Sequence, residues 1–460
     1  MTSADLVVLG AGPAGVGAAY RTARAGHAVV VSERAAVPGG AAGSFSFGGV
    51  RVDLGSHRLH PSIDPRVLAD LRALLGDGLE RRERNGRIRL EGRWIAFPLR
   101  PTDLARNLPP RLAAGIARDL AARPSRRPAD DGFAGALEAG LGPTLCRAFY
   151  FPYARKLWGL EPEDIDAEQA RRRVAADSPL RLVARLVRGR STPGWFWYPR
   201  NGYGAISEAL AGAAARAGAD LRFGNGATRV RLEAAGVEVT LEQGEALSAA
   251  RLWSTIPLAA LAAMSEPAPA PDVLQAARRL EVRSMVLVYL LLDRDRYTVF
   301  DAHYLPGEET PVTRISEPKN YRSGDDPRGR TALCAEIPCS FGDATWAATD
   351  AELGALVEST LVGAGLPVPP VQEVAVRRLR HAYPVYRKGF RGAFDALDEW
   401  ADAQPRLLTF GRQGLFAHDN LHHALAMAWD AADALGPHGA FDAAAWAAAR
   451  RRFADHVVED

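Results

Sequence analysis

The sequence predicts an α/β protein in which a Rossmann-like, dinucleotide-binding domain is interleaved with a second domain of the α+β class. Three observations support this prediction. A glycine-rich turn lies between an apolar strand and a helix near the N-terminus, strand and helix patterns return twice later in the chain, and consecutive strand patterns begin near residue 281. At 460 residues the chain is also too long for one ordinary core, which favours two domains.

The glycine-rich turn, Gly10-Ala11-Gly12-Pro13-Ala14-Gly15, directly follows an apolar run that predicts a buried strand. Gly10 permits the tight turn, Gly12 lets a pyrophosphate approach the backbone, and Gly15 lets the next helix pack closely on its strand. The first turn of that helix offers N–H groups to an anion. We therefore expect a dinucleotide at this turn.

The segment after the turn completes a βαβ unit. A helix over about Ala14 to Ala25 ends at Gly26, and a β-branched strand over Ala28 to Ser32 leads to Glu33. A carboxylate about 20 residues past the turn is placed to accept hydrogen bonds from a ribose. We include Glu33 and the adjacent Arg34 among the predicted cofactor-binding residues.

The composition is that of a soluble globular protein, with a net charge of +3. No run of about 18 uncharged apolar residues occurs, and Asp5 lies in an N-terminus without a basic signal region, so we expect a cytoplasmic protein. The cysteines Cys146, Cys334 and Cys339 have no C-x-x-C spacing and predict free thiols. The sequence shows no metal-ligand spacing, no Ser-His-Asp pattern and no nucleic-acid-binding motif.

Two segments after Glu33 carry a family resemblance. A second glycine-rich loop contains Gly39, Gly40 and Ala41, and the segment Asp53-Leu54-Gly55-Ser56-His57-Arg58 follows it. Together with the acid at Glu33, they resemble the flavin-dependent amine oxidase superfamily, which includes protoporphyrinogen oxidases, phytoene desaturases and UDP-galactopyranose mutases. The resemblance implies a glutathione-reductase-type FAD-binding domain, with Gly39 to Ala41 against the FAD phosphates and ribityl chain and Gly55 to His57 near the isoalloxazine ring. Glycine suits such a close approach of backbone to cofactor.

A C-terminal segment resembles the part of this superfamily that closes over FAD. A strand over Arg406 to Phe410 leads into Gly411-Arg412-Gln413-Gly414, and Asp419-Asn420-Leu421 begins a helix that runs to about Leu435. The resemblance implies that Gly411, Arg412, Asn420 and Leu421 bind FAD and that Val230 gives a backbone contact to the adenine. A helix N-terminus at the flavin N1/O2 edge would stabilise the charge of reduced flavin. Residues 415–418 differ from those of many relatives, which leaves the substrate open.

Residues 76–190 are rich in arginine and predict a basic helical insertion over the substrate. An amphipathic helix is expected over Arg111 to Arg123, and a basic helical run over Arg171 to Arg190. Such a block favours an anionic small-molecule substrate or a peripheral contact with an anionic membrane. A merely solvated helical face is the structural alternative.

Several elements resemble the protoporphyrinogen-oxidase-like branch of the superfamily. The segment Tyr153 to Trp158 is similar to a substrate-pocket element of both this branch and the galactopyranose-mutase-like proteins, with packing in the core as the equal alternative. Ile315 to Tyr321 and His381 to Arg387 resemble two further elements of the oxidase-like branch. The candidate catalytic residues are His57, Arg58, Lys156 and Lys319. For Lys319 an exposed loop position is the commoner interpretation.

From Glu281 onward the pattern predicts an antiparallel sheet. Its strands are expected over Arg283 to Leu292, Thr298 to Tyr304, Val312 to Ile315 and Thr331 to Ile337. We therefore divide the chain into a discontinuous FAD-binding domain (1–75, 191–275 and 400–460) and a substrate domain (76–190 and 276–399).

These expectations converge on an FAD-dependent oxidoreductase that transfers a hydride from an organic, anionic substrate to flavin N5. A second hypothesis is a non-redox sugar-nucleotide mutase, in which arginines clamp a diphosphate. A third is a non-enzymatic, escort-type relative that keeps the fold without flavin, although the intact glycines at both ends of the FAD site argue against it. The oligomeric state stays open.

Overall fold

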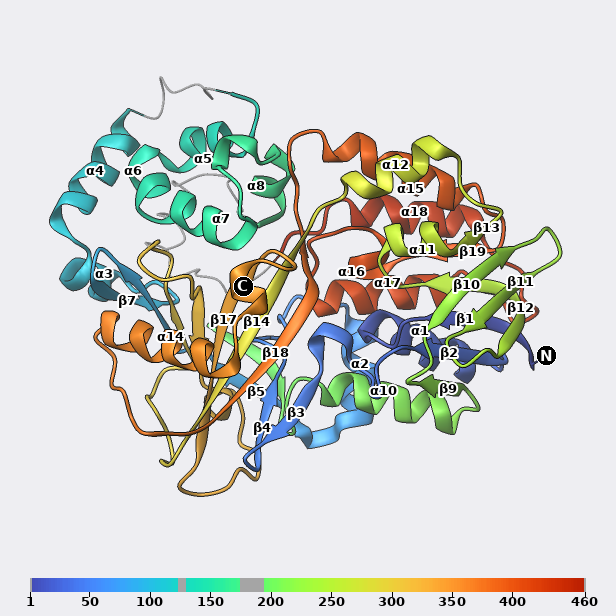
Figure 1. Ribbon diagram of the computed structural model, residues 1–460, viewed down its shortest axis with the longest axis horizontal. Coiled ribbons are helices and arrows are strands. Elements are labelled where there is room, and N and C mark those ends of the chain that lie inside the picture. The colour runs from blue at the N-terminus through green and yellow to red at the C-terminus, as the bar shows by residue number, and fades with distance from the viewer. Residues whose placement is uncertain (1, 123–129, 174–193, 459–460) are drawn as a thin grey trace.

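The computed structural model describes residues 2–122, 130–173 and 194–458. Two large sheets dominate this part of the chain, with helices packed on their faces (Figure 1). The eight-stranded sheet lies on the right of Figure 1 and the seven-stranded sheet on the left, beneath a group of helices that includes α4 to α8. The predicted α/β fold class is confirmed.

The eight-stranded sheet has the order β13-β10-β11-β12-β1-β2-β9, with β19 also paired to β12. Its strands are β1 (Thr2–Leu9), β2 (Val29–Glu33), β9 (Asp220–Phe223), β10 (Ala227–Leu232), β11 (Val237–Leu241), β12 (Ala246–Ser254), β13 (Ser265–Glu266) and β19 (Leu407–Thr409). The central strands β12, β1, β2 and β9 pair in parallel, and β19 joins the second half of β12 in parallel as well. The hairpin of β10 and β11 joins the first half of β12 in antiparallel pairing.

The central strands are apolar on both faces because helices cover both faces. Leu6 and Val8 of β1 pack into the core formed with α1 (Pro13–Arg24), α10 (Ala205–Arg216) and α17 (Leu421–Asp433). Val7 and Leu9 point into the opposite core, which contains residues of α11 (Leu258–Met264), α12 (Pro271–Arg279) and α15 (Phe390–Asp402).

The seven-stranded sheet has the order β18-β14-β17-β16-β15-β6-β7. Its strands are β6 (Gly86–Leu90), β7 (Arg93–Phe97), β14 (Val282–Leu292), β15 (Ala302–Tyr304), β16 (Arg314–Ser316), β17 (Thr331–Cys339) and β18 (Val371–Pro384). Neighbouring strands are antiparallel, as predicted, except that β15 pairs with β6 in parallel.

Strand β15 is shorter than predicted, and a buried carboxylate explains why. Glu317 accepts hydrogen bonds from the backbone N–H groups of Tyr297 and Thr298, at 2.8 and 3.1 Å. These two groups are therefore unavailable to a strand ladder, and regular pairing begins only at Ala302.

The prediction of a helical insertion over residues 76–190 was wrong for its first part, which is β-structure. Besides β6 and β7, this part contains β5 (Leu79–Glu83), which pairs with β8 (Trp195–Pro199). Buried Gly86, Ile88 and Leu90 alternate with Arg87 and Arg89, a period of two that indicates a strand. The arginines at alternate positions made the segment look like a polar, basic stretch, so the strand was not predicted.

The helical part of the insertion begins at residue 101. Its helices are α3 (Pro101–Asn107), α4 (Pro110–Ala121), α5 (Phe133–Leu141), α6 (Pro143–Leu145), α7 (Phe151–Trp158) and α8 (Ala167–Arg173). The predicted amphipathic helix is α4, which buries Leu112 and exposes Arg111 and Arg118. Most of the basic run predicted over Arg171 to Arg190 lies outside the described residues.

A hairpin of β3 (Ser44–Phe47) and β4 (Val50–Asp53) connects the two sheets. Leu287 and Tyr289 of β14 pack against this hairpin, whereas Val286 and Val288 point to the other face, toward α14 (Asp350–Gly363). The remaining helices are α2 (Pro65–Leu75), α13 (Ala344–Ala347), α16 (Gly411–Gly414) and α18 (Ala443–Phe453). This arrangement supports the division into two interleaved domains, which we retain as a proposal.

Within the described ranges, none of the helices combines the length and the apolar character needed to cross a membrane.

Candidate functional site

The glycine-rich turn leaves room at the start of α1. A Cβ atom on Gly15 would lie 1.9 Å from the carbonyl oxygen of Gly10, so this position requires the close packing that glycine allows. A Cβ atom on Gly12 would meet no atom within 4 Å. The N-cap of α1 is Gly12, and no side chain caps the helix there. Backbone N–H groups and open space therefore coincide at this turn, an arrangement that fits a phosphate.

The Glu33 carboxylate accepts hydrogen bonds from this turn and from the residues after β2. Its Oε2 accepts a hydrogen bond from the Ala11 N–H and its Oε1 accepts one from the Ala35 N–H, each at 2.7 Å. A carboxylate has about four acceptor positions, so these two bonds leave capacity for a ribose hydroxyl. The adjacent Arg34 is exposed.

The second glycine-rich loop lies against the first. The Gly39 N–H donates to the Ala11 carbonyl at 2.9 Å, and a Cβ on Gly40 would stand 3.4 Å from the Cα of Gly12. Gly39 has φ +119°, in the left-handed region that favours glycine. Gly40 and Ala41 are exposed beside the open space at Gly12.

The C-terminal segment returns to the start of α1. Gly411 has φ +78°, and a Cβ there would lie 2.9 Å from the Cβ of Ala14. The Arg412 guanidinium stacks 4.8 Å from the ring centre of Tyr383. Asn420 is the N-cap of α17, whose first residue is Leu421. The structure thus brings residues about 400 positions apart in sequence to one place. Val230 lies apart from this contact, fully buried in β10.

Buried Asp53 anchors the segment from Gly55 to Arg58. Its carboxylate accepts hydrogen bonds from Tyr198, from Ser44 at 2.5 Å and from the Tyr203 N–H at 2.9 Å, and its carbonyl accepts one from Tyr289 at 2.6 Å. Strands β3, β8 and β14 are therefore held to one residue at the end of β4. Asp53 was part of the predicted motif, but its role as an anchor could not be inferred from the motif.

The contacts of His57 show where its ring donates a hydrogen bond. Nε2 lies 2.9 Å from the Leu54 carbonyl and 3.1 Å from the Ala41 carbonyl, and since carbonyls only accept, Nε2 carries the hydrogen. Burial lowers the pKa of His57, against the attraction of Asp53. The ring stacks on Tyr203 with 5.0 Å between centres.

Arg58 belongs to a buried polar cluster on the seven-stranded sheet. Its guanidinium donates to Asp301 at 3.2 Å, to Tyr304 at 3.0 Å and to Tyr321 at 3.2 Å. Tyr321 also contacts the Ser56 hydroxyl at 2.5 Å. The charge of Arg58 is thus balanced within the protein.

A second ion pair, Arg314 with Glu336, adjoins this cluster. Nη2 of Arg314 lies 2.8 Å from both carboxylate oxygens of Glu336 and 3.1 Å from the Ser56 carbonyl. Glu336 also accepts the Ser56 N–H at 2.7 Å. The sequence-based selection missed this pair and the tyrosines at 203, 304 and 321. Tyr321 lies within the segment Ile315 to Tyr321 that resembles the superfamily, whereas Arg314 and Glu336 have no local signal.

The two candidate catalytic lysines are each bound to main-chain carbonyls. Lys156 Nζ donates to Leu305, Gly307 and Val312 at 2.6 to 2.7 Å. Burial lowers the pKa of Lys156 to about 8, which still leaves it mainly charged at neutral pH. Lys319 is buried rather than exposed, and its Nζ donates to Asp295 and to the carbonyls of Pro327 and Arg330 at 2.8 to 3.0 Å. These contacts indicate that Lys156 and Lys319 stabilise loops rather than act as catalytic residues.

Replacing Lys156 with methionine should therefore destabilise the fold without removing a cofactor. Three buried carbonyl groups would lose their hydrogen-bond donor, and each unsatisfied group costs about 1–3 kcal/mol. Because the loops can relax in part, we expect the free energy of unfolding to fall by about 2–4 kcal/mol. Urea unfolding measures this loss. Lys388→Met is the control, because Lys388 is nearly half exposed and lies 3.8 Å from Asp130. Equal stability of the two variants would contradict the assignment.

The aromatic segment that ends at Trp158 is partly buried among the helices of the insertion. Trp158 is buried against Phe133, and Phe149 contacts Tyr150 and Tyr153. Phe149, Tyr150 and Tyr153 are only partly buried, so the structure supports the packing alternative most directly for Trp158.

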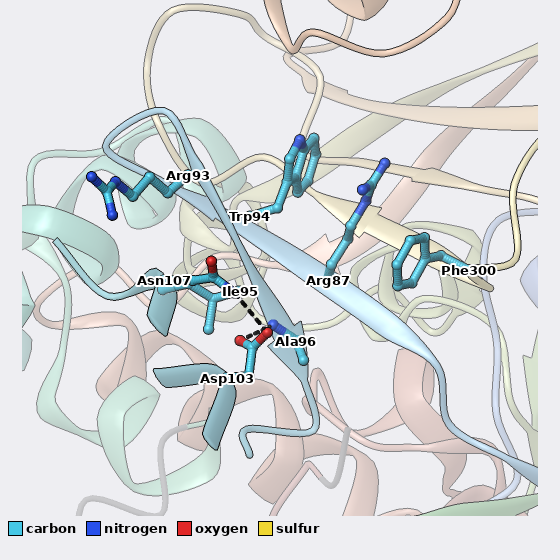
Figure 2. Close-up of a pocket in the computed structure, with 8 residues that line it drawn as sticks. All are labelled: Arg87, Arg93, Trp94, Ile95, Ala96, Asp103, Asn107 and Phe300. Carbon is cyan, nitrogen blue, oxygen red and sulfur yellow. Dashed lines mark hydrogen bonds between the residues drawn. The ribbon is translucent and has the colours of Figure 1, made fainter. Parts of the chain in front are cut away.

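A pocket of about 510 Å³ opens at the edge strand β7 (Figure 2). Its lining is Arg87, Arg93, Trp94, Ile95, Ala96, Asp103, Asn107 and Phe300. The Arg87 guanidinium lies 4.3 Å from the Trp94 ring centre and 4.4 Å from that of Phe300. Arg87 pairs with His303 and the next residue, Ile88, pairs with Tyr304. Because side chains alternate along a strand, Arg87 and Tyr304 face opposite sides of the sheet. Arg87 therefore lies on the other face of the sheet from Tyr304, which contacts Arg58.

Comparison with known proteins gives consistent results. The model of a family described as "Flavin containing amine oxidoreductase" matches residues 13–435. Two curated relatives from strains of Mycobacterium tuberculosis, named "Putative flavin-containing monoamine oxidase AofH", are 29% identical over 290 residues, which is 59% of this chain. The chain spans 61% of the length of these relatives.

Two solved structures share the fold over 94% of this chain at 20% identity. One is a reduced UDP-galactopyranose mutase, with a TM-score of 0.79 and 94% of its own chain covered. The other is a "Putative protoporphyrinogen oxidase" from Exiguobacterium sp. 255-15, with a TM-score of 0.70 and 98% of its chain covered.

Proposed function

Because this chain belongs to the family of flavin-containing amine oxidoreductases, we propose that it is an FAD-dependent oxidoreductase that takes a hydride from an organic, anionic substrate. A bound flavin would supply the hydride acceptor at its N5 atom. The observation that carries the proposal is the meeting of Gly12, Gly40 and Gly411 around the open start of α1. These glycines come from three separate segments that the family resemblance assigns to one cofactor.

The residues that would hold FAD are those predicted from the sequence. In this proposal the turn at Gly10 to Gly15 and the loop at Gly39 to Ala41 bind the pyrophosphate, and Glu33 binds the ribose. The start of α17 at Asn420 and Leu421 would lie beside the flavin, where a helix N-terminus favours negative charge. Val230 would contact the adenine.

The residues beside the predicted flavin position would orient the substrate. His57 donates from Nε2 to the Leu54 carbonyl, and a ring with its single hydrogen there keeps a lone pair on Nδ1. Ser56 is fixed between Glu336 and Tyr321, at 2.7 and 2.5 Å. Fixed polar groups of this kind position a substrate at little entropic cost at the moment of reaction. We propose positioning roles for these residues and for Arg58.

The anionic character of the substrate rests on arginines other than Arg58 and Arg314, whose charges are balanced by Asp301 and Glu336. Arg111 and Arg118 are exposed on α4. We propose that these groups attract a carboxylate or phosphate, and we retain peripheral membrane contact and a cytoplasmic location as further proposals.

A non-redox sugar-nucleotide mutase is the second candidate. The fold similarity to UDP-galactopyranose mutase, at a TM-score of 0.79, favours it, while the residues at Ile315 to Tyr321 and His381 to Arg387 resemble the oxidase-like branch instead. The two candidates differ in whether the flavin changes its redox state over a turnover.

Anaerobic spectroscopy separates the two candidates. Primary amines and carboxylate- or phosphate-bearing analogues are added one at a time to the oxidised holoenzyme. We expect at least one to bleach the flavin band, and an electron acceptor to restore it. Raising the salt should weaken the effect of an anionic substrate, since exposed charges are screened over about 8–10 Å. Turnover of a UDP-sugar only after reduction by dithionite, with no bleaching by any probe, would contradict the proposal and support the mutase.

A further inference from the structure

Three potential metal ligands meet where α17 begins. They are Asp419, His423 and His456, and their ligand atoms all lie within 4.8 Å of one another. Asp419 Oδ1 is 3.1 Å from His456 Nδ1 and 3.5 Å from His423 Nδ1. The two imidazole rings stack with 4.2 Å between centres. The family resemblance gives no role to this cluster.

The two separations from Asp419 are close to those between neighbouring ligands of a zinc ion. Two ligands at about 2.0–2.1 Å from a tetrahedral zinc ion are about 3.3 Å apart. The measured 3.1 and 3.5 Å lie on either side of that value. Two imidazoles and one carboxylate are also a ligand set found at zinc sites that keep a fourth position for water.

The Asp419 carboxylate supplies an independent observation. Its side chain is 0% exposed, and Oδ2 has no hydrogen-bond partner among the described residues. A buried carboxylate oxygen without a partner is costly, and a cation removes that cost. The side chains of His423 and His456 are 12% and 16% exposed, so an ion can reach the cluster from solvent.

We propose that Asp419, His423 and His456 bind a divalent transition metal of the zinc type, with water as the fourth ligand. The ion joins the C-terminal segment to the start of α17. That segment also donates a hydrogen bond from Val458 to the Arg172 carbonyl at 2.7 Å. His423 Nδ1 accepts the Asn420 N–H at 3.2 Å, and a metal on this nitrogen would replace that hydrogen bond. The proposal does not depend on the redox role of the flavin.

Cobalt titration of the full-length holoprotein tests the site. After removal of any histidine tag and dialysis against EDTA, one equivalent of Co²⁺ should give the intense visible bands of four-coordinate cobalt, and Zn²⁺ should abolish them. Zn²⁺ should also raise the melting temperature, because an ion that binds only the folded state stabilises it.

Two variants separate this site from general histidine binding. His456→Ala should weaken Co²⁺ binding by at least about 100-fold, since even changes outside the first coordination shell cost 10- to 100-fold. His438→Ala is the matched control, because His438 is exposed and absent from the cluster. Wild-type protein that shows only six-coordinate cobalt, or equal binding by the two variants, would overturn the proposal.

Discussion

Replacing Gly12 with valine should leave the protein folded and strip it of flavin. A Cβ at this position meets no protein atom within 4 Å, and the backbone there, at φ −66° and ψ 175°, is extended and accessible to any residue. The added methyl groups would occupy space that the phosphates need. Overpacking costs about 1–3 kcal/mol, which corresponds to about a 5- to 150-fold weaker affinity for FAD. Flavin absorbance after purification and reconstitution measures the loss.

Gly15→Ala is the contrasting variant. Its Cβ would fall 1.9 Å from the Gly10 carbonyl oxygen, so we expect lost stability together with lost flavin. Circular dichroism and thermal unfolding distinguish the two outcomes. A yellow Gly12→Val protein with wild-type affinity for FAD would contradict the placement of the pyrophosphate.

Replacing Glu336 with glutamine should destabilise the protein by about 3–5 kcal/mol, because it leaves the buried charge of Arg314 without a partner. The side chains of this pair are only 13% and 5% exposed. Ser56, held by Glu336 through its N–H, should also become less ordered, so reduction of the flavin by substrate should slow. Denaturant unfolding and anaerobic stopped-flow absorbance measure the two effects.

Two further variants isolate the cause. The double change Arg314→Met with Glu336→Leu removes both charges and should recover much of the lost stability. Glu281→Gln breaks an exposed pair with Arg387, at 2.7 Å, and should cost less than about 1 kcal/mol. An equal loss of unfolding free energy in Glu281→Gln and Glu336→Gln would show that burial of the ion pair does not determine its contribution to stability.

The sequence was sufficient for the fold class and the flavin, because these depend on local patterns. The turn at Gly10 to Gly15 combines strand, glycine and helix signals within a few residues, and the family match confirms the flavin cofactor. The long strand β18 was not predicted, because it lacks the alternation of a half-buried strand: Val371 to Ala375 have no period of two in their burial.

Contacts between residues far apart in the chain could not be predicted from the sequence. Arg314 and Glu336 lie 22 residues apart on neighbouring strands, and nothing in either local segment specifies the partner. Lys156 and Lys319 were selected because their segments resemble elements of the superfamily, whereas their carbonyl acceptors depend on loop geometry that only the folded chain defines. The cluster of Asp419 and His423 with His456 was missed for the same reason, since a four-residue spacing alone is too common to indicate a metal.

The strand order of the eight-stranded sheet also affects how the protein is made. Translation supplies β1 and β2 first, but their sheet gains β19 only when residue 409 has been synthesised, and α1 gains its neighbour α17 only at residues 421–433. All strands of the seven-stranded sheet, which ends at Pro384, are therefore synthesised before α16 and α17 can pack at the start of α1. If the segments at Gly411 and α17 complete the proposed cofactor site, we expect flavin to bind only after residues 411–433 have been synthesised.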